Sequence, residues 1–454
     1  MSFLHSLAGA NILIFGAGVT GKPTEDFLRS RGALVTVLDE RETGAHVRNS
    51  IENLAWESFS LAVVSPGWKP DHPWITTAQK KRVPLLSEID LAWRARHEIA
   101  PHQRWIGLTG TNGKTTTVQM AEALALAGNL KAQACGNVGT TVIEAVSAAE
   151  ADLLILELSS FQLEWSNEFM LESAAILNIA PDHIDWHGSF DRYAAAKFRI
   201  AQRCKVLILN AGDEEISKRA RNISNRIIFF SLNTPANHQI GLVENLIIDR
   251  AFVSGDAEVL FELSDLNPAA PHNVLNAMAA AALVRSIGMT NEPIGSALRN
   301  FKLDHHRLEL IGEFDGTKWI DDSKATNPHA AIAALQSQLS AIWIAGGLAK
   351  GAEMDDIVEA TKSRIKAAIL IGTDAPIIES ALRNHAPEIV RHMMDPSLKG
   401  AALMKEVVNC AKKIAQPGDT VLLAPACASM DQFKNYAERG DLFATAVREA
   451  HHVS

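Results

Sequence analysis

The feature of this sequence that most constrains its fold is a pattern repeated along the whole chain, in which a short apolar run leads into a turn and then into a helical stretch. Uninterrupted apolar runs separated by helical segments are typical of parallel strands that helices cover on both faces. We therefore predict an α/β fold, with ligands at the carboxyl ends of the strands. The strands predicted from these runs are residues 11–15, 34–38, 61–64, 105–108, 153–156, 174–177, 341–345, 367–371 and 421–424.

Composition and charge limit the class of partner. Hydrophobic residues make up 47% of the chain and charged residues 21%, which is ordinary for a soluble globular protein. The net charge of −9 argues against nucleic acid, although a local basic pocket can still bind a small anion. The four cysteines lie far apart, so neither structural zinc nor a disulfide framework is expected. No apolar run reaches the ~20 residues of a membrane span, so we expect a cytoplasmic protein with no membrane partner.

Two polar segments, residues 94–103 and 299–304, predict domain boundaries. The first lies between two strand–turn–helix patterns, and the second follows an Ala-rich helix. A chain of 454 residues, at roughly 100–200 residues per domain, gives about three domains. We therefore expect domains at residues 1–100, 101–301 and 302–454.

A phosphate-binding loop is predicted at residues 107–116, Gly-Leu-Thr-Gly-Thr-Asn-Gly-Lys-Thr-Thr, between a strand and a helix. Its backbone N–H groups and the helix N-terminus can bind phosphates. Lys114 is expected to reach the β- and γ-phosphates, and the Thr115 hydroxyl to bind Mg²⁺. Leu108 stands where the usual loop has its first glycine, so an ordinary Gly-rich turn remains the alternative. The expected nucleotide-binding residues here are Gly110, Thr111, Asn112, Gly113, Lys114, Thr115 and Thr116.

A second glycine-rich turn, Gly-Ala-Gly-Val-Thr-Gly at residues 16–21, lies between an expected strand and an expected helix. Asp39 follows 18 residues later, at the end of the next strand. This spacing is typical of a dinucleotide-binding fingerprint, so an NAD-dependent dehydrogenase is an alternative function. A dehydrogenase does not explain the phosphate loop.

Polar residues gather after two further strands. Glu157 ends one strand, and a carboxylate there can bind Mg²⁺, or it can simply be an acid at the start of a helix. After the next strand come Asn178, Asp182, His183, Asp185 and His187. Zinc is an alternative for this cluster, but Mg²⁺ better fits a chain with a phosphate loop. We interpret Asp185 and His187 as solvated loop residues.

The loop Thr-Gly-Thr-Asn-Gly-Lys-Thr with its shifted glycine resembles the loop of the Mur ligase family, which folylpolyglutamate synthases share. Further motifs that resemble the family's lie at residues 136–139, 193–199, 272–276, 306–309, 321–327 and 425–436. The resemblance covers nearly the whole chain. It implies a Rossmann-like N-terminal domain, a central domain with a P-loop ATPase-like parallel sheet, and a Rossmann-like C-terminal domain.

The resemblance implies ATP and two Mg²⁺ ions as cofactors. Thr115 and Glu157 match residues that hold the first Mg²⁺, and His183 matches a ligand of the second. Lys197 matches a lysine that CO₂ converts to a carbamate, whose anionic oxygens serve the metal; nearby cations favour the neutral amine that reacts. Without the resemblance, Lys197 would be interpreted as an exposed helix lysine. The expected catalytic residues are Lys114, His183, Lys197 and Arg307.

Four further residues match nucleotide contacts of the family. Asn273 and Asn276 lie three residues apart, so they share one helix face and can pair with an adenine edge; a helix cap is the alternative. Arg307 would bind the ATP phosphates through its guanidinium fork, with a surface arginine as the alternative. Asp322 matches an acid that holds the ribose.

The two substrates have their own sets of matching residues. The expected contacts with a UDP-substrate are Gly18, Val19, Thr20, Asp39, Arg41, Gly67, Asn137 and His183. The expected contacts with D-glutamate are Lys324, Thr326, Lys350, Ser429 and Tyr436. Leu348 stands where some members carry an acid. Residues 425–436 are close to those of members that add D-glutamate, and His329 replaces the arginine of the Asn-Pro-Arg signature in members that add a diamino acid.

Together these correspondences imply an ATP-dependent ligase that activates a carboxylate as an acyl phosphate and joins it to an amine, in cytoplasmic peptidoglycan precursor synthesis. The implied substrates are UDP-N-acetylmuramoyl-L-alanine and D-glutamate, and we expect a monomer. Besides the dehydrogenase, a non-catalytic nucleotide sensor and a folylpolyglutamate synthase remain alternatives, although the fingerprint at residues 16–21 argues against the last.

Overall fold

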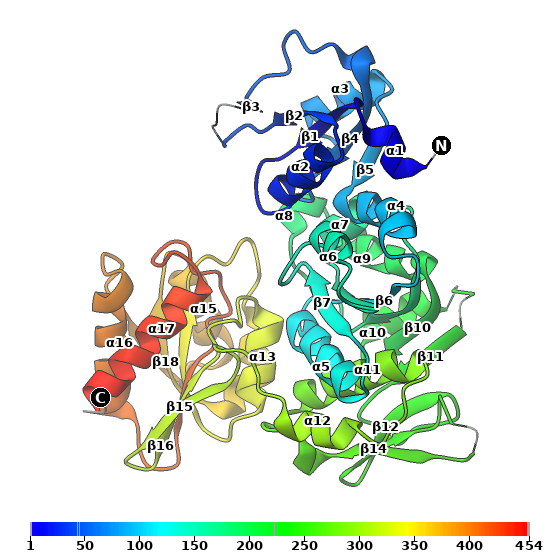
Figure 1. Ribbon diagram of the computed structural model, residues 1–454. Coiled ribbons are helices and arrows are strands. Elements are labelled where there is room, and N and C mark those ends of the chain that lie inside the picture. Colours follow the sequence, from blue (N-terminus) through cyan, green and yellow to red (C-terminus); the bar gives the residue numbers. More distant parts are fainter. Residues whose placement is uncertain are drawn as a thin grey trace. The chain divides into compact units, whose positions relative to one another are not determined.

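The computed structural model describes residues 2–42, 44, 46–221, 223–224, 226–253 and 255–451, which form three β-sheets covered by helices (Figure 1). These residues divide into two compact units. The first comprises residues up to 179, residues 186–269 and residues 273–301; the second comprises residues 180–185, 270–272 and those from 302 onwards. The first unit holds a five-stranded and a nine-stranded sheet, and the second holds a six-stranded sheet.

The five-stranded sheet is wholly parallel and has the order β3-β2-β1-β4-β5. This is the Rossmann order, so the Rossmann-like prediction for the N-terminal region is confirmed. Its central strand supplies core residues, since residues 12–15 are fully buried. The strands are β1 (Asn11–Phe15), β2 (Leu34–Leu38), β3 (Val47–Arg48), β4 (Phe59–Val64) and β5 (Leu85–Ser87), and the helices are α1 (Phe3–Leu7), α2 (Gly21–Ser30), η1 (Trp56–Ser58), α3 (Pro73–Lys80) and α4 (Glu88–Ile99).

The nine-stranded sheet has the order β14-β13-β12-β11-β10-β9-β6-β8-β7. Its strands are β6 (Arg104–Thr109), β7 (Ala132–Gly136), β8 (Leu153–Glu157), β9 (Leu171–Ile176), β10 (Cys204–Asn210), β11 (Arg226–Phe230), β12 (Gln239–Val243), β13 (Leu246–Asp249) and β14 (Glu258–Glu262). The sheet is parallel from β7 to β12, which agrees with the predicted parallel α/β fold, although only β6, β8 and β9 were predicted as strands; β13 and β14 pair antiparallel. The sequence analysis missed this antiparallel end because these strands are short and partly exposed.

Helices flank the nine-stranded sheet and carry several candidate site residues. The Ala-rich helix α11 is buried on all sides from Ala277 to Val284, as expected for a helix that is apolar all round. The helices are α5 (Lys114–Ala127), α6 (Val142–Ala148), α7 (Ser160–Trp165), α8 (Ile184–His187), α9 (Phe190–Phe198), η2 (Arg199–Arg203), α10 (Glu214–Ala220), η3 (Leu263–Asp265), α11 (Pro271–Ser286) and α12 (Ile294–Asn300).

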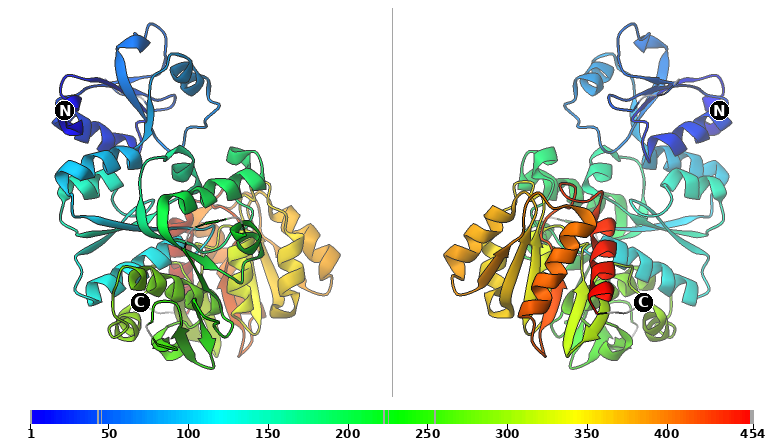
Figure 2. Two further views of the ribbon diagram at one scale, coloured as in Figure 1. Left: turned by 90° about the vertical axis from the view of Figure 1, so that its right-hand side faces the viewer. Right: turned by 90° about the vertical axis from the view of Figure 1, so that its left-hand side faces the viewer.

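The six-stranded sheet has the order β15-β16-β20-β17-β18-β19, parallel except for the pair β15–β16. Successive residues of a strand face opposite sides, so Ile342 and Trp343 belong to separate cores. Helices α16 and α17 cover one face (Figure 2, right). The elements are β15 (Glu309–Phe314), β16 (Thr317–Asp321), α13 (Pro328–Gln336), β17 (Ala341–Gly346), α14 (Asp355–Thr361), η4 (Lys362–Arg364), β18 (Ile365–Ile371), α15 (Ala375–His385), β19 (Val390–Met393), α16 (Gly400–Ile414), β20 (Thr420–Leu423) and α17 (Tyr436–Ala450).

Helix α4 ties the two sheets of the first unit together through buried carboxylates. Asp90 accepts hydrogen bonds from the backbone N–H groups of Asn167 and Glu168, both at 2.8 Å. Glu88 accepts one from the N–H of Ile143 at 2.6 Å. Desolvation raises the pKa of Glu88 to about 7, so this carboxyl group titrates near neutrality.

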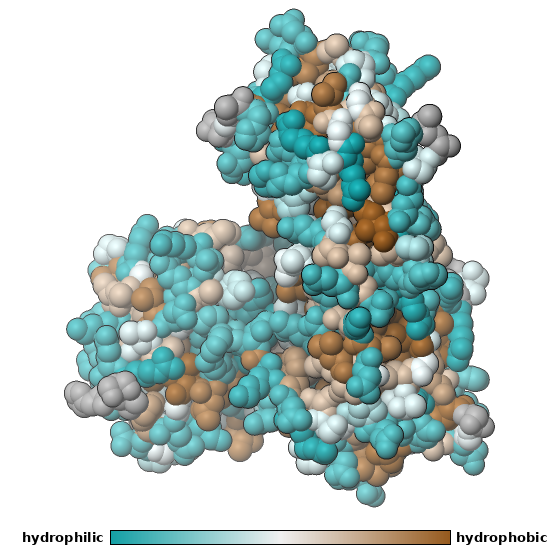
Figure 3. Space-filling view, viewed as in Figure 1, coloured by the Kyte–Doolittle hydropathy of each residue, from teal (hydrophilic) through white to brown (hydrophobic). Residues whose placement is uncertain are grey.

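The lengths and hydropathy of the described helices bear on whether the chain could span a membrane. Within the described part of the chain, every helix is too short or too polar to cross a lipid bilayer. On the face drawn in Figure 3, hydrophilic residues cover most of each unit, and smaller hydrophobic areas are scattered among these residues.

Candidate active site

The predicted phosphate loop joins β6 to α5, so its strand–loop–helix context is confirmed. Lys114 folds back over the loop, and its Nζ donates to the carbonyl oxygens of Gly110 and Thr111, both at 2.9 Å. Gly113 precedes the helix with a φ of 80°, which favours glycine. A Cβ on Gly113 would lie 2.4 Å from Oδ1 of Asn276, so α11 packs directly against the loop.

Asn178, which follows β9, holds the loop in shape. Its Oδ1 accepts from the N–H of Asn112 at 2.8 Å, and its Nδ2 donates to the carbonyl of Asn112 at 3.0 Å. Its backbone carbonyl accepts from the N–H of Thr111 at 3.0 Å. Asn178 was predicted only as a member of a polar cluster, and this role was not predicted. Its position at the end of a strand next to β6 was the available signal.

Lys197 lies on α9 with only 2% of its surface exposed, so the interpretation as an exposed helix lysine is wrong. Its Nζ donates to the carbonyl oxygen of Gly110 at 2.7 Å, the same oxygen that accepts from Lys114. Tyr193, one turn earlier, places its ring 4.8 Å from Nζ, and its hydroxyl is 2.9 Å from Oγ1 of Thr111. The side-chain nitrogens of Lys114 and Lys197 therefore meet at one carbonyl oxygen of the phosphate loop.

Glu157 ends β8, in register with Leu108 of β6, and is 1% exposed. Its Oε1 accepts from Nδ2 of Asn137 at 2.8 Å. Its Oε2 is buried and has no hydrogen-bond partner among the described residues. A carboxylate oxygen that is buried without a partner is costly, and a divalent cation would satisfy it, so the geometry fits Mg²⁺. Thr115, the other expected ligand, is half-buried in the first turn of α5.

The polar cluster after β9 is divided between the two units. His183 lies in the segment 180–185, with a φ of 53°, and its N–H donates to Oδ1 of Asp182 at 2.9 Å. Its expected role at a second Mg²⁺ stays a prediction. Asp185 is exposed, as expected. His187 is not solvated: it is buried, 2.9 Å from Oγ of Ser160, and stacks on Phe161.

The two asparagines predicted to contact adenine are buried in the first turns of α11. Asn273 donates from Nδ2 to the carbonyl of Pro268 at 3.3 Å. Asn276 faces Gly113 of the phosphate loop. Of the two amides, that of Asn276 is therefore the one that lies against the phosphate loop, and the contact of both with adenine stays a prediction.

The glycine-rich turn of the first sheet brings backbone atoms very close together. A Cβ on Gly21 would lie 1.8 Å from the carbonyl oxygen of Gly16, so only glycine fits. Asp39 accepts from the N–H groups of Ala17 and Arg41, each at 2.9 Å. Burial opposes ionisation of Asp39, but these N–H groups and that of Glu42 hold its pKa below the usual value.

Other expected UDP-substrate contacts surround this turn. Val19 is 86% exposed at the turn, and Gly18 has open space around its Cα. The carbonyl of Gly67 accepts from Nε1 of Trp186 at 3.2 Å. Thr20 directly precedes α2, and Arg41 is exposed beyond β2. These residues line one edge of the first sheet, and their ligand contacts stay predictions.

The second unit brings most of its expected site residues together. Nζ of Lys324 lies 3.7 Å from the ring centroid of Tyr436. The loops of Lys350 and Ser429 lie side by side, since Leu348 and the neighbouring Ala428 exchange backbone hydrogen bonds of 2.8 and 3.0 Å. Thr326 follows Lys324, and its N–H donates to the Lys324 carbonyl at 2.8 Å. Arg307 and Asp322 belong to neighbouring loops, because the N–H of Leu308 donates to Oδ1 of Asp322 at 3.2 Å.

Comparison with known proteins identifies the family. A family model described as the Mur ligase middle domain matches residues 108–284, and one described as the Mur ligase, glutamate ligase domain matches residues 306–427. A Streptomyces coelicolor protein named UDP-N-acetylmuramoylalanine--D-glutamate ligase is 45% identical, over 97% of this chain and 98% of its own. The chain belongs to the Mur ligase family. A Thermobifida fusca relative of the same name is 44% identical to this Mur ligase, over 97% and 99% of the two chains.

Solved structures resemble this Mur ligase in fold at low sequence identity. A pseudomurein peptide ligase type C from Methanothermus fervidus has a TM-score of 0.61 and 18% identity, covering 97% of this chain and all of that one. The MurF ligase of Thermotoga maritima, solved with ADP, has a TM-score of 0.60 and 16% identity, covering 99% and 100%. The predicted three-domain α/β fold is therefore confirmed, while the exact domain limits stay predictions.

Proposed function

We propose that this Mur ligase adds D-glutamate to UDP-N-acetylmuramoyl-L-alanine, using ATP, in cytoplasmic peptidoglycan precursor synthesis. The observation that carries the proposal is the meeting of Lys114 and Lys197 on one carbonyl oxygen of the phosphate loop. This arrangement supports a triphosphate site at the loop, and the full-length similarity to ligases of that name supports the proposed substrates.

The first half-reaction transfers the γ-phosphoryl group of ATP. An oxygen of the alanyl carboxylate attacks the γ-phosphorus, the bond to the β-phosphate oxygen breaks, and ADP and an acyl phosphate result. Lys114, the loop N–H groups and Arg307 stabilise the charge on the phosphate oxygens. Mg²⁺ held by Thr115 and Glu157 would neutralise part of that charge. Asn273 and Asn276 would hold the adenine, and Asp322 the ribose.

The second half-reaction forms the amide bond. The D-glutamate amine attacks the acyl carbon, and the C–O bond to phosphate then breaks, releasing inorganic phosphate and a proton. Lys324, Thr326, Lys350, Ser429 and Tyr436 are proposed to bind D-glutamate, the lysines through its carboxylates.

Two finer features belong to the same proposal. We propose that Lys197 carries a carbamate formed from CO₂. Beside a bound cation, this buried anionic group is more favourable than a second buried ammonium group would be. His183 and this carbamate would bind a second Mg²⁺. We also propose that the enzyme works as a monomer with small-molecule substrates only.

The test is a phosphate-release assay across several UDP-muramoyl acceptors and amino acids. We expect release only when ATP, UDP-N-acetylmuramoyl-L-alanine and D-glutamate are all present, with L-glutamate as the matched control. Release with an acceptor that lacks the alanine, or equal release with L-glutamate, would contradict the proposed substrates. Enhanced NADH fluorescence on mixing, without any phosphate release, would instead favour the dehydrogenase.

A further inference from the structure

The loop that carries Arg307 adopts a conformation that ordinary residues avoid. His306 has a φ of 64° and Leu308 a φ of 46°, so Arg307 lies between two left-handed non-glycine residues. Such residues persist only where the surrounding structure fixes them, and they gather at functional sites. The contacts that fix this loop therefore bear directly on the position of Arg307.

Three backbone hydrogen bonds hold the loop. The N–H of His306 donates to Oε2 of Glu309 at 2.9 Å, and its carbonyl accepts from the N–H of Lys324 at 3.2 Å. The N–H of Leu308 donates to Oδ1 of Asp322 at 3.2 Å. The loop is thus fastened to the segment 321–324, which carries proposed binding residues of its own.

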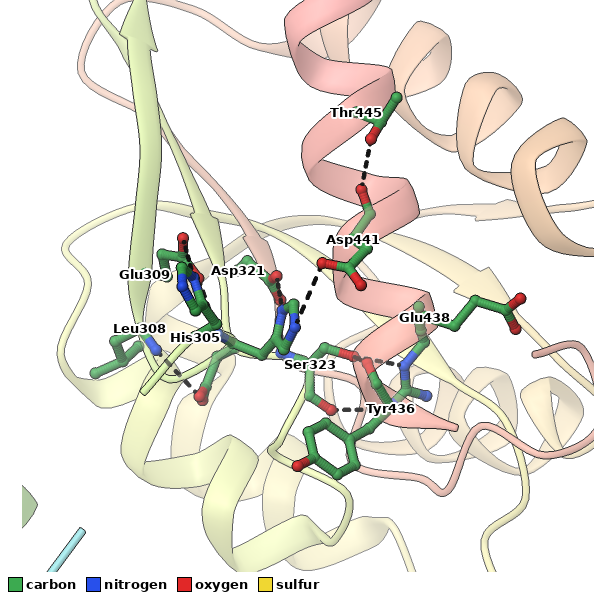
Figure 4. Close-up of polar contacts among 12 residues, drawn as sticks. His305, Leu308, Glu309, Asp321, Ser323, Tyr436, Glu438, Asp441 and Thr445 are labelled. Carbon is green, nitrogen blue, oxygen red and sulfur yellow. Dashed lines mark hydrogen bonds and ion pairs between the residues drawn. The ribbon is translucent and has the colours of Figure 1, made fainter. Parts of the chain in front are cut away.

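A buried side-chain pair completes the attachment (Figure 4). Nδ1 of His306 lies 2.7 Å from Oδ2 of Asp321, which is fully buried at the end of β16. The other oxygen of Asp321 accepts from the N–H of Ser323 at 2.8 Å. Each member of the pair directly precedes a proposed ATP contact in the sequence, namely Arg307 and Asp322.

Helix α17 packs directly over the pair. A Cβ on Gly440 would lie 2.2 Å from Nδ1 of His306 and 2.5 Å from Oδ2 of Asp321, so the helix could not pack here with a larger residue. The neighbouring Arg439 is fully buried and donates to Oγ and the carbonyl of Ser323 at 3.0 and 2.9 Å. The pair is therefore enclosed by the same helix that begins with Tyr436.

The charges that face His306 are mostly negative. Asp321 on β16 is the nearest, Glu309 on β15 binds its backbone, and Asp441 on α17 lies 3.7 Å from Nε2. The cation Arg439 also lies on α17. The hydrogen bond to Asp321 raises the pKa of His306 although burial opposes this, and the other two carboxylates act in the same direction as Asp321.

We propose that His306 and Asp321 are positioning residues, which hold the guanidinium of Arg307 and the carboxylate of Asp322 in place for the ATP of the proposed reaction. The inference rests on the proposed function. It assigns the pair no contact with substrate. Because the ion pair exists only while His306 is protonated, this positioning weakens as the pH rises through the raised pKa of His306.

The test compares three variants by their KM for ATP across pH 6 to 9. Asp321→Asn keeps the size but removes the charge, and we expect KM for ATP to rise about tenfold, with the affinity for the UDP-substrate unchanged. The rise of KM with pH in the wild type should be absent in this variant. In His306→Asn, the asparagine tolerates a positive φ, and its side chain offers an N–H near the place of Nδ1. The KM of this variant for ATP should lie closer to the wild-type value than that of Asp321→Asn, and it should not change with pH. His305→Ala removes the exposed neighbouring histidine and should behave as the wild type.

An unchanged KM for ATP and an unchanged pH profile in Asp321→Asn would overturn the proposal. If that variant does not fold, as judged by circular dichroism, the pH profile of His306→Asn decides, and a profile equal to the wild type's overturns it. If the wild type itself releases no phosphate, the proposed function fails. In that case the Kd for ATP of the wild type and of Asp321→Asn is measured by calorimetry, and equal Kd values would contradict the positioning role of the pair.

Discussion

The side-chain amide of Asn137 donates a 2.8 Å hydrogen bond to Oε1 of Glu157, while Oε2 of the same carboxylate is buried without a hydrogen-bond partner among the described residues. Asn137 was predicted to contact the UDP-substrate. The geometry indicates a second role for Asn137, because its hydrogen bond fixes the orientation of the Glu157 carboxylate. It leaves the other oxygen available at the strand end beside the phosphate loop, where Glu157 would be able to hold a Mg²⁺ ion.

Glu157→Gln should weaken Mg²⁺ binding specifically. The variant keeps an oxygen that can accept from Asn137 but loses the charge, so the Mg²⁺ concentration for half-maximal phosphate release should rise about tenfold or more. A Mg²⁺ titration at saturating ATP measures this. Glu150→Gln, at an exposed position, is the control. An unchanged Mg²⁺ requirement would remove Glu157 from the metal site.

Lys197→Ala should reduce phosphate release to about 1% of the wild-type rate or less, because the carbamate proposed to bind the second Mg²⁺ is lost. Binding of the UDP-substrate, measured by calorimetry, should be unchanged. Lys205→Ala, at an exposed position on β10, is the matched control and should retain full activity. Full activity of Lys197→Ala would contradict both its catalytic role and the carbamate.

The carbamate itself has a separate test. Acetate can supply carboxylate oxygens in the space that the Lys197→Ala side chain leaves, so it should restore part of the lost activity. Wild-type enzyme prepared without CO₂ should lose activity and regain it with bicarbonate. Activity that is insensitive to CO₂ would show that the free amine is sufficient.

Gly21→Ala should abolish the tight turn in the five-stranded sheet. The added Cβ would lie 1.8 Å from the Gly16 carbonyl, so the backbone must move, at a cost of about 1–3 kcal/mol of unfolding free energy. UDP-substrate affinity should fall with it. Denaturant unfolding and calorimetry measure the two effects. Gly255→Ala, where nothing lies within 4 Å of the added Cβ, is the control, and equal effects in both variants would count against this explanation.

Glu88→Gln should change the pH dependence of stability. Desolvation raises the pKa of Glu88 from 4.5 to about 7, so the folded state binds more protons than the unfolded state between these values. The unfolding free energy of the wild type should therefore fall as the pH rises through this window, by up to about 3 kcal/mol. The variant, whose side chain stays neutral, should lack this fall.

Denaturant unfolding at pH 5, 6, 7 and 8 measures the Glu88 effect as the difference between wild type and variant. Glu388→Gln, at an exposed position in the second unit, should retain the wild-type dependence. Parallel pH curves for wild type and Glu88→Gln would mean that Glu88 ionises normally in the folded protein.

The local part of the fold could be predicted from the chain. All nine predicted strands are present, and the phosphate loop lies between β6 and α5 because apolar runs and glycines specify backbone conformation over a few residues. Eleven further strands of the described residues were not predicted, among them the antiparallel β13 and β14, whose short, partly exposed segments carry a weak pattern. The solvated interpretation of His187 was wrong, because its burial against Phe161 depends on packing with α7.

By itself, the sequence determined the α/β class, the order of the motifs and which residue types stand at the strand ends, because these depend on periodicity and spacing along the chain. Only the tertiary structure decided that Lys197 is buried on the Gly110 carbonyl and that His306 pairs with Asp321 beneath Gly440. Each of these contacts joins residues of different secondary-structure elements or loops. Their burial and charge partners follow from how whole elements pack, which no local pattern encodes.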